Sequence, residues 1–260
     1  MDLTGKTAIV TGGGLGIGYG ISNRLAQAGA SIVIAERNEE AGKSAEENLA
    51  SAGLKAIFVD TDVSVEQSVK NLMEKTISKY GAIDILVNNA GIYPTIPLKD
   101  MSIQDFEKVL AVNLKGAFLC TKYASDDMIK RKQGGKIINI TSIDALHPSS
   151  VGLAHYDASK HGLWGFTKNI ALELAQYGIS VNAIAPGGIL TPGVQRLQKS
   201  MPLPDGVDPK LILESFLNKI PMRRLGNPDE IGKVALFLAS DMSSYMTGSQ
   251  IVVDGGALLS

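Results

Sequence analysis

The sequence contains one cysteine, Cys120, and only three histidines among its 260 residues. A single cysteine excludes an internal disulfide, and His147, His155 and His161 lack the spacing typical of zinc sites. Cys120 lies in the apolar run 117–120, which indicates packing within a helix rather than a nucleophilic role. We therefore predict no metal centre.

A charge excess of either sign is also missing. Lys and Arg total 25 against 26 for Asp and Glu, a net charge of −1, so no basic field exists to attract nucleic acid or anionic lipid. The apolar runs fall far short of the roughly 20 residues that a membrane span needs. Residues 1–6 show no charged-then-apolar secretory signal. We expect a soluble, cytoplasmic protein with no nucleic-acid or membrane partner.

The chain instead alternates short apolar segments with helical patterns. Nearly all-apolar strands between helices are typical of a parallel sheet covered on both faces, and 260 residues suit one large domain. We predict a single-domain, doubly wound α/β fold over 1–260. The expected strands are Thr7–Val10, Ser31–Ala35, Ala56–Val59, Ile83–Asn88, Gly135–Thr141, Ser180–Ala185 and Gln250–Val253. The expected helices are Gly16–Ala28, Glu39–Ala52, Val65–Tyr80, Ile103–Lys132, Tyr156–Tyr177 and Pro228–Ala239.

Residues 191–221 depart from this alternation. Four prolines lie between Pro192 and Pro209, and the amphipathic piece Lys210–Ile220 has no matching strand. Insertions between sheet elements often form lids over active sites. We predict a substrate lid over 191–221, with a passive surface loop as the alternative.

A glycine-rich turn follows the first expected strand. Residues Thr11–Gly18 read Thr-Gly-Gly-Gly-Leu-Gly-Ile-Gly, and the first helix begins inside this run. Glycines at such a turn let the backbone approach a pyrophosphate, which then lies at the positive end of the helix. Such turns also serve packing alone, but the strand-turn-helix context favours a dinucleotide site.

Glu36 ends the second expected strand, eighteen residues after Gly18. An acid near this distance accepts hydrogen bonds from the adenosine ribose and repels a 2′-phosphate, which favours NAD. Arg37 keeps NADP open, because a guanidinium there could bind a 2′-phosphate, although Leu15 supplies no basic partner.

Polar residues also follow the third and fourth expected strands, at Asp62 and at 88–91. Ligands bind at the carboxyl ends of strands in open α/β sheets. Asp62 is suited to accept a hydrogen bond from an adenine amino group, or to cap the helix that starts near Val65.

Tyr156 and Lys160 are four residues apart on an expected helix and therefore share a face. An ammonium held near a phenol favours the phenolate and lowers a pKa that is ordinarily about 10. The pair, with Ser142 fourteen positions upstream, predicts an acid/base device, although Tyr and Lys at this spacing also form ordinary solvated helix faces.

These motifs together resemble the short-chain dehydrogenase/reductase family, in the branch with subunits of about this length, over nearly the entire chain. The resemblance implies a seven-stranded, Rossmann-like parallel sheet, a nicotinamide cofactor, and reversible hydride transfer between an alcohol and a carbonyl. The matching elements are Thr11–Gly18, Asp62-Val63, Asn88–Gly91, Asn113 in 112–116, Ser142 in 139–142, Tyr156 with Lys160, and Pro186-Gly187 with Thr191.

The resemblance also implies roles for four catalytic residues. Tyr156 donates a proton to the carbonyl oxygen in reduction and accepts the alcohol proton in oxidation. Lys160 lowers the tyrosine pKa and binds the nicotinamide ribose, Ser142 steadies the substrate oxygen, and Asn113 holds a water that links Lys160 to solvent. The family resemblance further suggests pro-S hydride transfer. The serine-to-tyrosine interval is one residue longer than is common in the family, which leaves Thr141 and Ser149 as rivals for the serine role.

The predicted cofactor site combines the motifs with this resemblance. Its residues come from the glycine turn, the ends of the second, third and fourth strands, the helix with Tyr156, and the nicotinamide-side segment 186–191. They are Gly12, Gly14, Leu15, Gly16, Ile17, Gly18, Glu36, Arg37, Asp62, Val63, Asn89, Ala90, Gly91, Tyr156, Lys160, Pro186, Gly187, Ile189 and Thr191.

The loop between Ser142 and Tyr156 is expected to line the substrate pocket through Asp144, His147 and His155. A polar lining suits a sugar, polyol or other small hydroxylated substrate, because its hydroxyls need partners once desolvated. As the alternative, each of the three residues has only a local structural role, in the loop or at the start of the following helix, and does not contact the substrate.

The apolar side chains of the predicted lid suit other substrates, so a 3-oxoacyl thioester reductase and a hydroxysteroid-type dehydrogenase stay as alternatives. A non-catalytic dinucleotide sensor is more remote, since Tyr156 and Lys160 are both present. Apolar residues on more than one face of 103–132 and 156–177, together with the family resemblance, predict a homotetramer.

Overall fold

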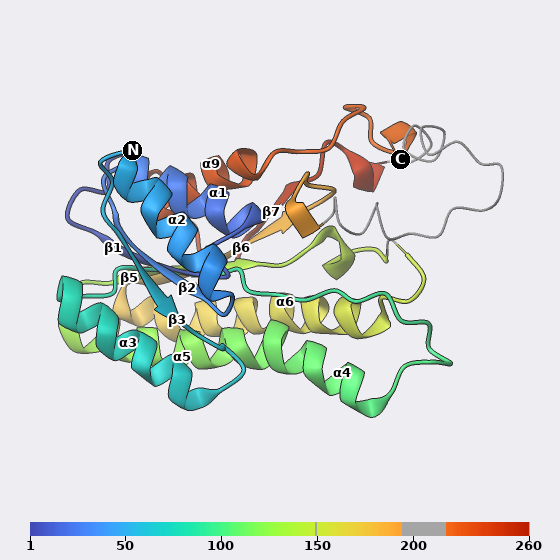
Figure 1. The fold of residues 1–260 in the computed structure, drawn as a ribbon, viewed down its shortest axis with the longest axis horizontal. Coiled ribbons are helices and arrows are strands. Elements are labelled where there is room, and N and C mark those ends of the chain that lie inside the picture. The colour runs from blue at the N-terminus through green and yellow to red at the C-terminus, as the bar shows by residue number, and fades with distance from the viewer. Residues whose placement is uncertain (149, 194–216, 260) are drawn as a thin grey trace.

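The computed structural model describes residues 1–148, 150–193 and 217–259. Its centre is a seven-stranded parallel sheet with strand order β3-β2-β1-β4-β5-β6-β7 (Figure 1). The strands are β1 (Thr7–Thr11), β2 (Ser31–Glu36), β3 (Ala56–Asp60), β4 (Ile85–Asn88), β5 (Gly135–Ile140), β6 (Ile179–Pro186) and β7 (Gln250–Val253). The predicted doubly wound, seven-stranded sheet is confirmed.

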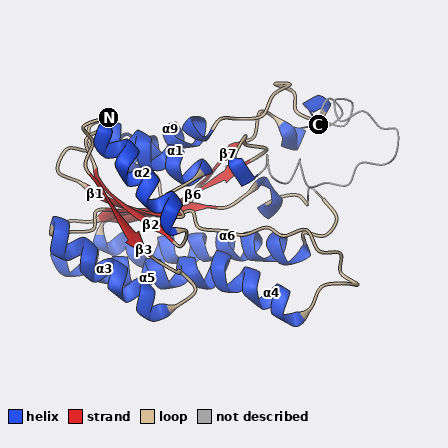
Figure 2. Cartoon of the chain, viewed as in Figure 1, coloured by secondary structure: helices blue, strands red, loops and turns tan. Residues whose placement is uncertain are grey.

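Helices cover both faces of the sheet (Figures 1 and 2). One layer contains α1 (Gly16–Gln27), α2 (Glu39–Ser51) and α9 (Pro228–Ala239). The opposite layer contains α3 (Glu66–Tyr80), α4 (Ile103–Leu110), α5 (Gly116–Arg131) and α6 (Ala154–Leu174). Within the described ranges, no helix combines the length and apolar character needed to cross a membrane.

Alternate residues of the central strands enter two separate cores. Ala8 and Val10 of β1 belong to the core beneath α1 and α9, whereas Ile9 belongs to the core beneath α3 and α5. All five residues of β1 are buried. Because successive strand side chains point to opposite faces, a strand covered on both sides is nearly all apolar, as the sequence pattern predicted.

The expected continuous helix over Ile103–Lys132 is wrong in one respect. A π-helical segment, Ala111–Lys115, separates α4 from α5. The wider turn carries Asn113, whose side chain hydrogen-bonds the backbone of Ile92. Single π-turns inside α-helices often mark functional sites, and this one lies behind the loop that follows β4.

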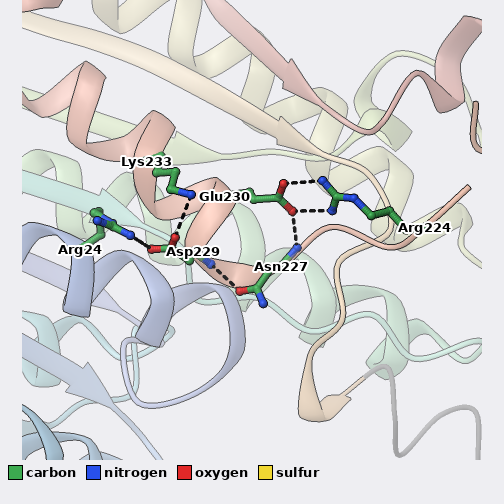
Figure 3. Close-up of polar contacts among 6 residues, drawn as sticks. All are labelled: Arg24, Arg224, Asn227, Asp229, Glu230 and Lys233. Atoms are coloured by element: carbon green, nitrogen blue, oxygen red, sulfur yellow. Dashed lines mark hydrogen bonds and ion pairs between the residues drawn. The ribbon is translucent and has the colours of Figure 1, made fainter. Parts of the chain in front are cut away.

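Helix α9 fixes the position of α1. Arg24 of α1 donates a hydrogen bond from Nε to Asp229 Oδ1 at 2.8 Å, and a Cβ on Gly20 would meet the Pro228 backbone at 2.6 Å. Asn227 and Glu230 form a capping box at the start of α9 (Figure 3). The hydrogen bond from Arg224 lowers the pKa of Glu230 to about 2, so this cap stays ionised across the ordinary pH range. The middle of α1, from Gly20 to Arg24, is thus held against the start of α9.

The predicted lid, residues 191–221, falls mostly on 194–216, which lie outside the described residues. Residues on either side of that segment are in contact, since Leu190 N donates to Gly226 O at 2.8 Å and Gly226 N donates to Gly188 O at 2.9 Å. The carboxyl end of β6 is therefore tied to the approach to α9.

Candidate functional site

A cavity of about 510 Å³ opens along the carboxyl edge of the sheet. This volume is in the range of small-molecule sites. Its lining includes every predicted cofactor residue except Gly14, and three of the four predicted catalytic residues: Ser142, Tyr156 and Lys160. These predicted residues come from seven separate parts of the sequence, 12–18, 36–37, 62–63, 89–91, 142, 156–160 and 186–191, and meet in one place.

The cavity straddles the junction of β1 and β4, where the chain leaves neighbouring strands in opposite directions. Thr11 Oγ1 accepts hydrogen bonds from the backbone amides of Asn89 and Ala90, both at 3.0 Å. Asn89 Nδ2 donates in return to Thr11 O at 2.9 Å and Gly12 O at 3.1 Å. Such a junction is where open α/β sheets bind ligands.

The glycine turn is packed too closely for side chains. A Cβ on Gly18 would lie 2.0 Å from Gly12 O and 2.6 Å from Asn89 Nδ2, and Gly12 and Gly16 have φ values of +61° and +53°. The N-terminus of α1 has no side-chain cap and no acidic residue in its first turn. Uncapped amides at the positive end of a helix fit a pyrophosphate, so these residues are suited to hold a dinucleotide.

Glu36 is held beside this turn by backbone amides. Its Oε1 accepts from Arg37 N at 3.0 Å and Asn38 N at 3.1 Å, while Oε2 accepts from Gly14 N at 3.4 Å. A Cβ on Gly14 would meet Glu36 Cγ at 3.0 Å. Gly14 does not line the cavity. Its lack of a side chain leaves space for the side chain of Glu36.

Arg37 and Asp62 face each other across the mouth of the cavity, with Arg37 Nη1 3.8 Å from Asp62 Oδ2. Asp62 Oδ1 also accepts from Ser64 N at 2.9 Å and Ser64 Oγ at 2.6 Å. Burial raises the pKa of Asp62, but the Ser64 hydrogen bonds and the Arg37 charge outweigh it and lower the pKa below its ordinary value. The alternative role of Asp62 as a helix cap is not found, because Val65 is the N-cap of α3 and no side chain caps that helix. Asp62 instead holds the turn at Ser64 while it also lines the cavity.

Lys160 and Tyr156 lie at the other end of the cavity, on the first turns of α6. Lys160 Nζ donates to Ile140 O at 2.7 Å and lies 5.6 Å from the centre of the Tyr156 ring. Burial lowers the pKa of Lys160 to about 8, against the opposing charge of Asp144. The ammonium is therefore the main form of Lys160 near neutral pH.

The expectation that Lys160 lowers the pKa of Tyr156 is not met in this structure. Burial raises the pKa of Tyr156 well above its ordinary value, a hydrogen bond with Ser142 acts in the opposite direction, and the charge of Asp144 raises it further. Desolvation disfavours the phenolate more strongly than the Ser142 hydrogen bond favours it. Tyr156 is thus a protonated phenol at neutral pH.

Asn113 is buried behind the cavity and does not line it. Its Oδ1 accepts from Ile92 N at 2.8 Å, and its Nδ2 donates to Ile92 O at 2.9 Å and Ser159 Oγ at 3.0 Å. These contacts fix the loop after β4 against α6. A Cβ on Gly91 would lie within 3.6 Å of both the Asn113 side chain and Lys160 Nζ, so Asn113 and Lys160 flank Gly91.

The structure separates the three predicted substrate residues. Asp144 is buried and lines the cavity. His147 is exposed, with Nδ1 3.0 Å from Pro148 O. His155 is fully buried in α6, and its ring nitrogens have no hydrogen-bond partner among the described residues. Neither histidine lines the cavity, because the loop turns His147 outward and the helix turns His155 inward.

Of the rivals to Ser142, Thr141 Oγ1 lies 2.9 Å from both Ile184 O and Gln250 Oε1, and so faces β6 and β7. Ser149 lies outside the described residues. Tyr93 and Leu153 also line the cavity, and sequence reasoning missed both. The Tyr93 ring meets the Tyr156 ring edge-on, with centroids 6.0 Å apart. Tyr93 follows Gly91 by two residues, and this closeness to a predicted cofactor residue is the feature of the sequence that could have indicated its place in the cavity.

No group of three or more His, Cys, Asp or Glu side chains suited to a metal ion occurs in the part of the chain that the structure describes.

The packing around Gly18 makes a direct prediction. Gly18→Ala places a methyl against the Gly12 carbonyl and should weaken NADH binding by about tenfold or more, since a shift of the turn removes its fit to the pyrophosphate. NADH fluorescence titration measures the change. Gly165→Ala is the matched control, because its added methyl on α6 meets nothing within 4 Å. Equal NADH affinity in wild type and Gly18→Ala would contradict the assignment of the turn.

Comparison with known proteins agrees with this geometry. A family model described as Enoyl-(Acyl carrier protein) reductase matches residues 13–257. An uncharacterized oxidoreductase of Thermotoga maritima is 38% identical over 260 residues, covering 99% of each chain. A 3-oxoacyl-(acyl-carrier-protein) reductase of Aquifex aeolicus is 39% identical over 257 residues, covering 98% of each.

Among solved structures, a short-chain type dehydrogenase/reductase from Mycobacterium marinum superposes with a TM-score of 0.90 at 34% identity, covering 98% of this chain and 96% of that one. The similarity thus extends over the sheet, both helical layers and the cavity edge. The chain belongs to the short-chain dehydrogenase/reductase family of oxidoreductases, whose Rossmann fold implies binding of NAD or NADP.

Proposed function

We propose that this protein is an NAD-dependent oxidoreductase that interconverts a secondary alcohol and a ketone or aldehyde, with Tyr156 as the acid/base. The observation that supports it best is the arrangement of one cavity. Ser142, Tyr156 and Lys160 line it beside the carboxyl end of β5, whereas Glu36 lines it at the end of β2, with β1 and β4 between them. A dinucleotide bridging the two ends would have its reactive ring near the tyrosine.

The residues at the tyrosine end suit proton transfer. A bound nicotinamide would supply or take up the hydride. Tyr156 is a protonated phenol at neutral pH, since burial raises its pKa, and it is positioned to donate that proton to a carbonyl oxygen. The Lys160 ammonium, with a pKa of about 8, supplies positive charge beside the tyrosine as the proton leaves.

NAD is favoured over NADP by the way Glu36 is fixed. Three backbone amides hold its carboxylate beside the glycine turn, where a negative charge suits ribose hydroxyls and opposes a 2′-phosphate. Arg37 was the reason to retain NADP as an alternative cofactor, and its guanidinium forms an ion pair with Asp62. Its charge is thereby partly neutralised.

The substrate proposal is a sugar, polyol or other small hydroxylated compound, because buried Asp144 places a hydrogen-bond acceptor in the cavity. The main alternative is a 3-oxoacyl thioester. The Aquifex aeolicus relative carries such an activity in its name, and Tyr93 and Leu153 give the cavity apolar surface.

Two further expectations remain predictions. The segment 191–221 borders the cavity through Thr191, Pro192 and Gly193, which supports a role as a substrate lid. A cytoplasmic location without nucleic-acid partners rests on composition and charge.

Tyr156→Phe tests the reaction. The variant keeps the ring but has no proton to transfer, so turnover should fall by about 100-fold or more while NADH binding is preserved. The assay is a screen of sugars, polyols, secondary alcohols, hydroxysteroids and 3-oxoacyl thioesters with both cofactors. Normal turnover by Tyr156→Phe would refute the tyrosine assignment, and activity confined to thioesters would refute the polyol proposal.

Glu36→Ala tests the cofactor assignment. Loss of the carboxylate removes repulsion of the 2′-phosphate, so the ratio of kcat/KM for NADP to that for NAD should rise by about tenfold or more. Glu40→Ala, on the exposed first turn of α2, is the control and should leave the ratio unchanged. A wild-type preference for NADPH would contradict the role proposed for Glu36.

We also propose a homotetramer. Helices α4, α5 and α6 form one layer of the molecule (Figure 1), and Ile103, Phe118 and Leu172 are 72%, 44% and 82% exposed on them. Burying such side chains between copies is favourable. Sedimentation equilibrium should give the mass of four subunits, and Leu172→Asp should lower it. A wild-type mass of one subunit at working concentration contradicts the proposal.

A further inference from the structure

The Ser142 hydroxyl lies between two groups that compete for its proton. Ser142 Oγ donates to Asp144 Oδ2 at 2.8 Å and accepts from Asp144 N at 3.1 Å. A hydrogen bond with Ser142 also lowers the pKa of Tyr156. A serine hydroxyl has one proton, so Ser142 donates to either the Asp144 carboxylate or the Tyr156 oxygen at any moment.

Asp144 and Ser142 are both buried, so water does not replace the hydrogen bond between them. Asp144 is 7% exposed and Ser142 is 6% exposed, and both line the cavity. A hydrogen bond to a carboxylate is roughly twice as strong as one between neutral groups. While Tyr156 is a neutral phenol, the Ser142 proton therefore stays with Asp144.

We propose that Asp144 is a positioning residue of the reaction, which competes with Tyr156 for the single hydroxyl proton of Ser142 and thereby keeps Tyr156 in its proton-donating form. The inference rests on the proposed function and deepens it. While Ser142 is turned toward Asp144, the proton that reaches a carbonyl oxygen comes from Tyr156. Once Tyr156 becomes a phenolate, its charge matches that of Asp144, and Ser142 can turn to it by rotating its hydroxyl without breaking its O–H bond.

The charges around Tyr156 agree with this role. Besides Ser142, it is faced by Asp144 from the turn after β5, by Tyr93 from the loop after β4, and by Asp157 and Lys160 of α6. Asp144 raises the pKa of Tyr156 and of Lys160. Neutralising Asp144 should therefore make both groups lose their protons at lower pH.

A thiol at position 142 gives a test that needs no turnover. Ser142→Cys places an ionisable group at the competing position, and its rate of alkylation by iodoacetamide follows the thiolate fraction as pH rises. The native Cys120 is fully buried, and burial raises its pKa to about 12. Cys120 should therefore not react with iodoacetamide under these conditions. With Asp144 present, the thiol should ionise above the ordinary value of about 8.5.

Adding Asp144→Asn to Ser142→Cys should lower that midpoint by about one pH unit, since the carboxylate no longer opposes the thiolate. Asp157→Asn in the same background is the matched control. It removes a carboxylate that also faces Tyr156, and it should shift the midpoint by less than half as much. Asp144→Ala supplies the same comparison if thermal unfolding shows that the amide variant does not fold.

The second readout is the pH profile of carbonyl reduction. Reduction is lost as Lys160 and then Tyr156 lose their protons, and Asp144 raises the pKa of both. Asp144→Asn should therefore move the alkaline limb to lower pH by about one unit, and the part of that shift that needs Ser142 belongs to Tyr156. In a Ser142→Ala background the same substitution should move the limb by less than half as much, because the competition for the hydroxyl proton is gone. A full shift without Ser142 would show a direct charge effect and overturn the proposal.

An unchanged thiol midpoint in Asp144→Asn, or an equal shift in Asp157→Asn, also overturns the proposal. These outcomes are distinct from failure of the proposed function. A protein that oxidises and reduces none of the screened compounds contradicts that function, whereas the thiol midpoints report on Asp144 and Ser142 regardless of turnover.

Discussion

The hydrogen bonds between the end of β1 and the loop after β4 are the interaction on which the rest of the site depends. Thr11 Oγ1 accepts hydrogen bonds from the backbone amides of Asn89 and Ala90 in that loop. The Asn89 side chain donates hydrogen bonds to the carbonyls of Thr11 and Gly12. This arrangement needs two parallel strands that are neighbours in the sheet but distant in the sequence. It holds the start of α1 against the loop that Asn113 fixes from behind.

The two ends of the cavity differ in their electrostatics. Glu36 lies at one end, where three backbone amides hold its carboxylate and the side chain is only partly buried. Tyr156, Lys160 and Asp144 share the inner end, where desolvation controls protonation. Tyr156 is there a protonated phenol beside the Lys160 ammonium, and Ser142 interacts with both this phenol and the Asp144 carboxylate.

The sequence predicted the sheet and the place of the cavity well, because apolar strands covered on both faces and glycines at a tight turn have strong local signals. It did not predict the π-helical turn at 111–115, which depends on the tertiary contact between Asn113 and Ile92. The pKa of Tyr156 was expected to be lowered, and burial, which cannot be read from spacing, raises it. His147 and His155 were placed near the substrate by sequence proximity alone, whereas loop and helix geometry turn them away.

The central claim is that one dinucleotide spans the junction from Glu36 to Tyr156. Hydrogen–deuterium exchange of the wild-type protein with and without NAD measures this directly. We predict slowed exchange at the amides of 12–18, 89–92 and 187–190 together, because a ligand across the junction contacts the turn after β1, the loop after β4 and the segment after β6. Protection of only one of these segments, or of none at saturating NAD, would contradict it.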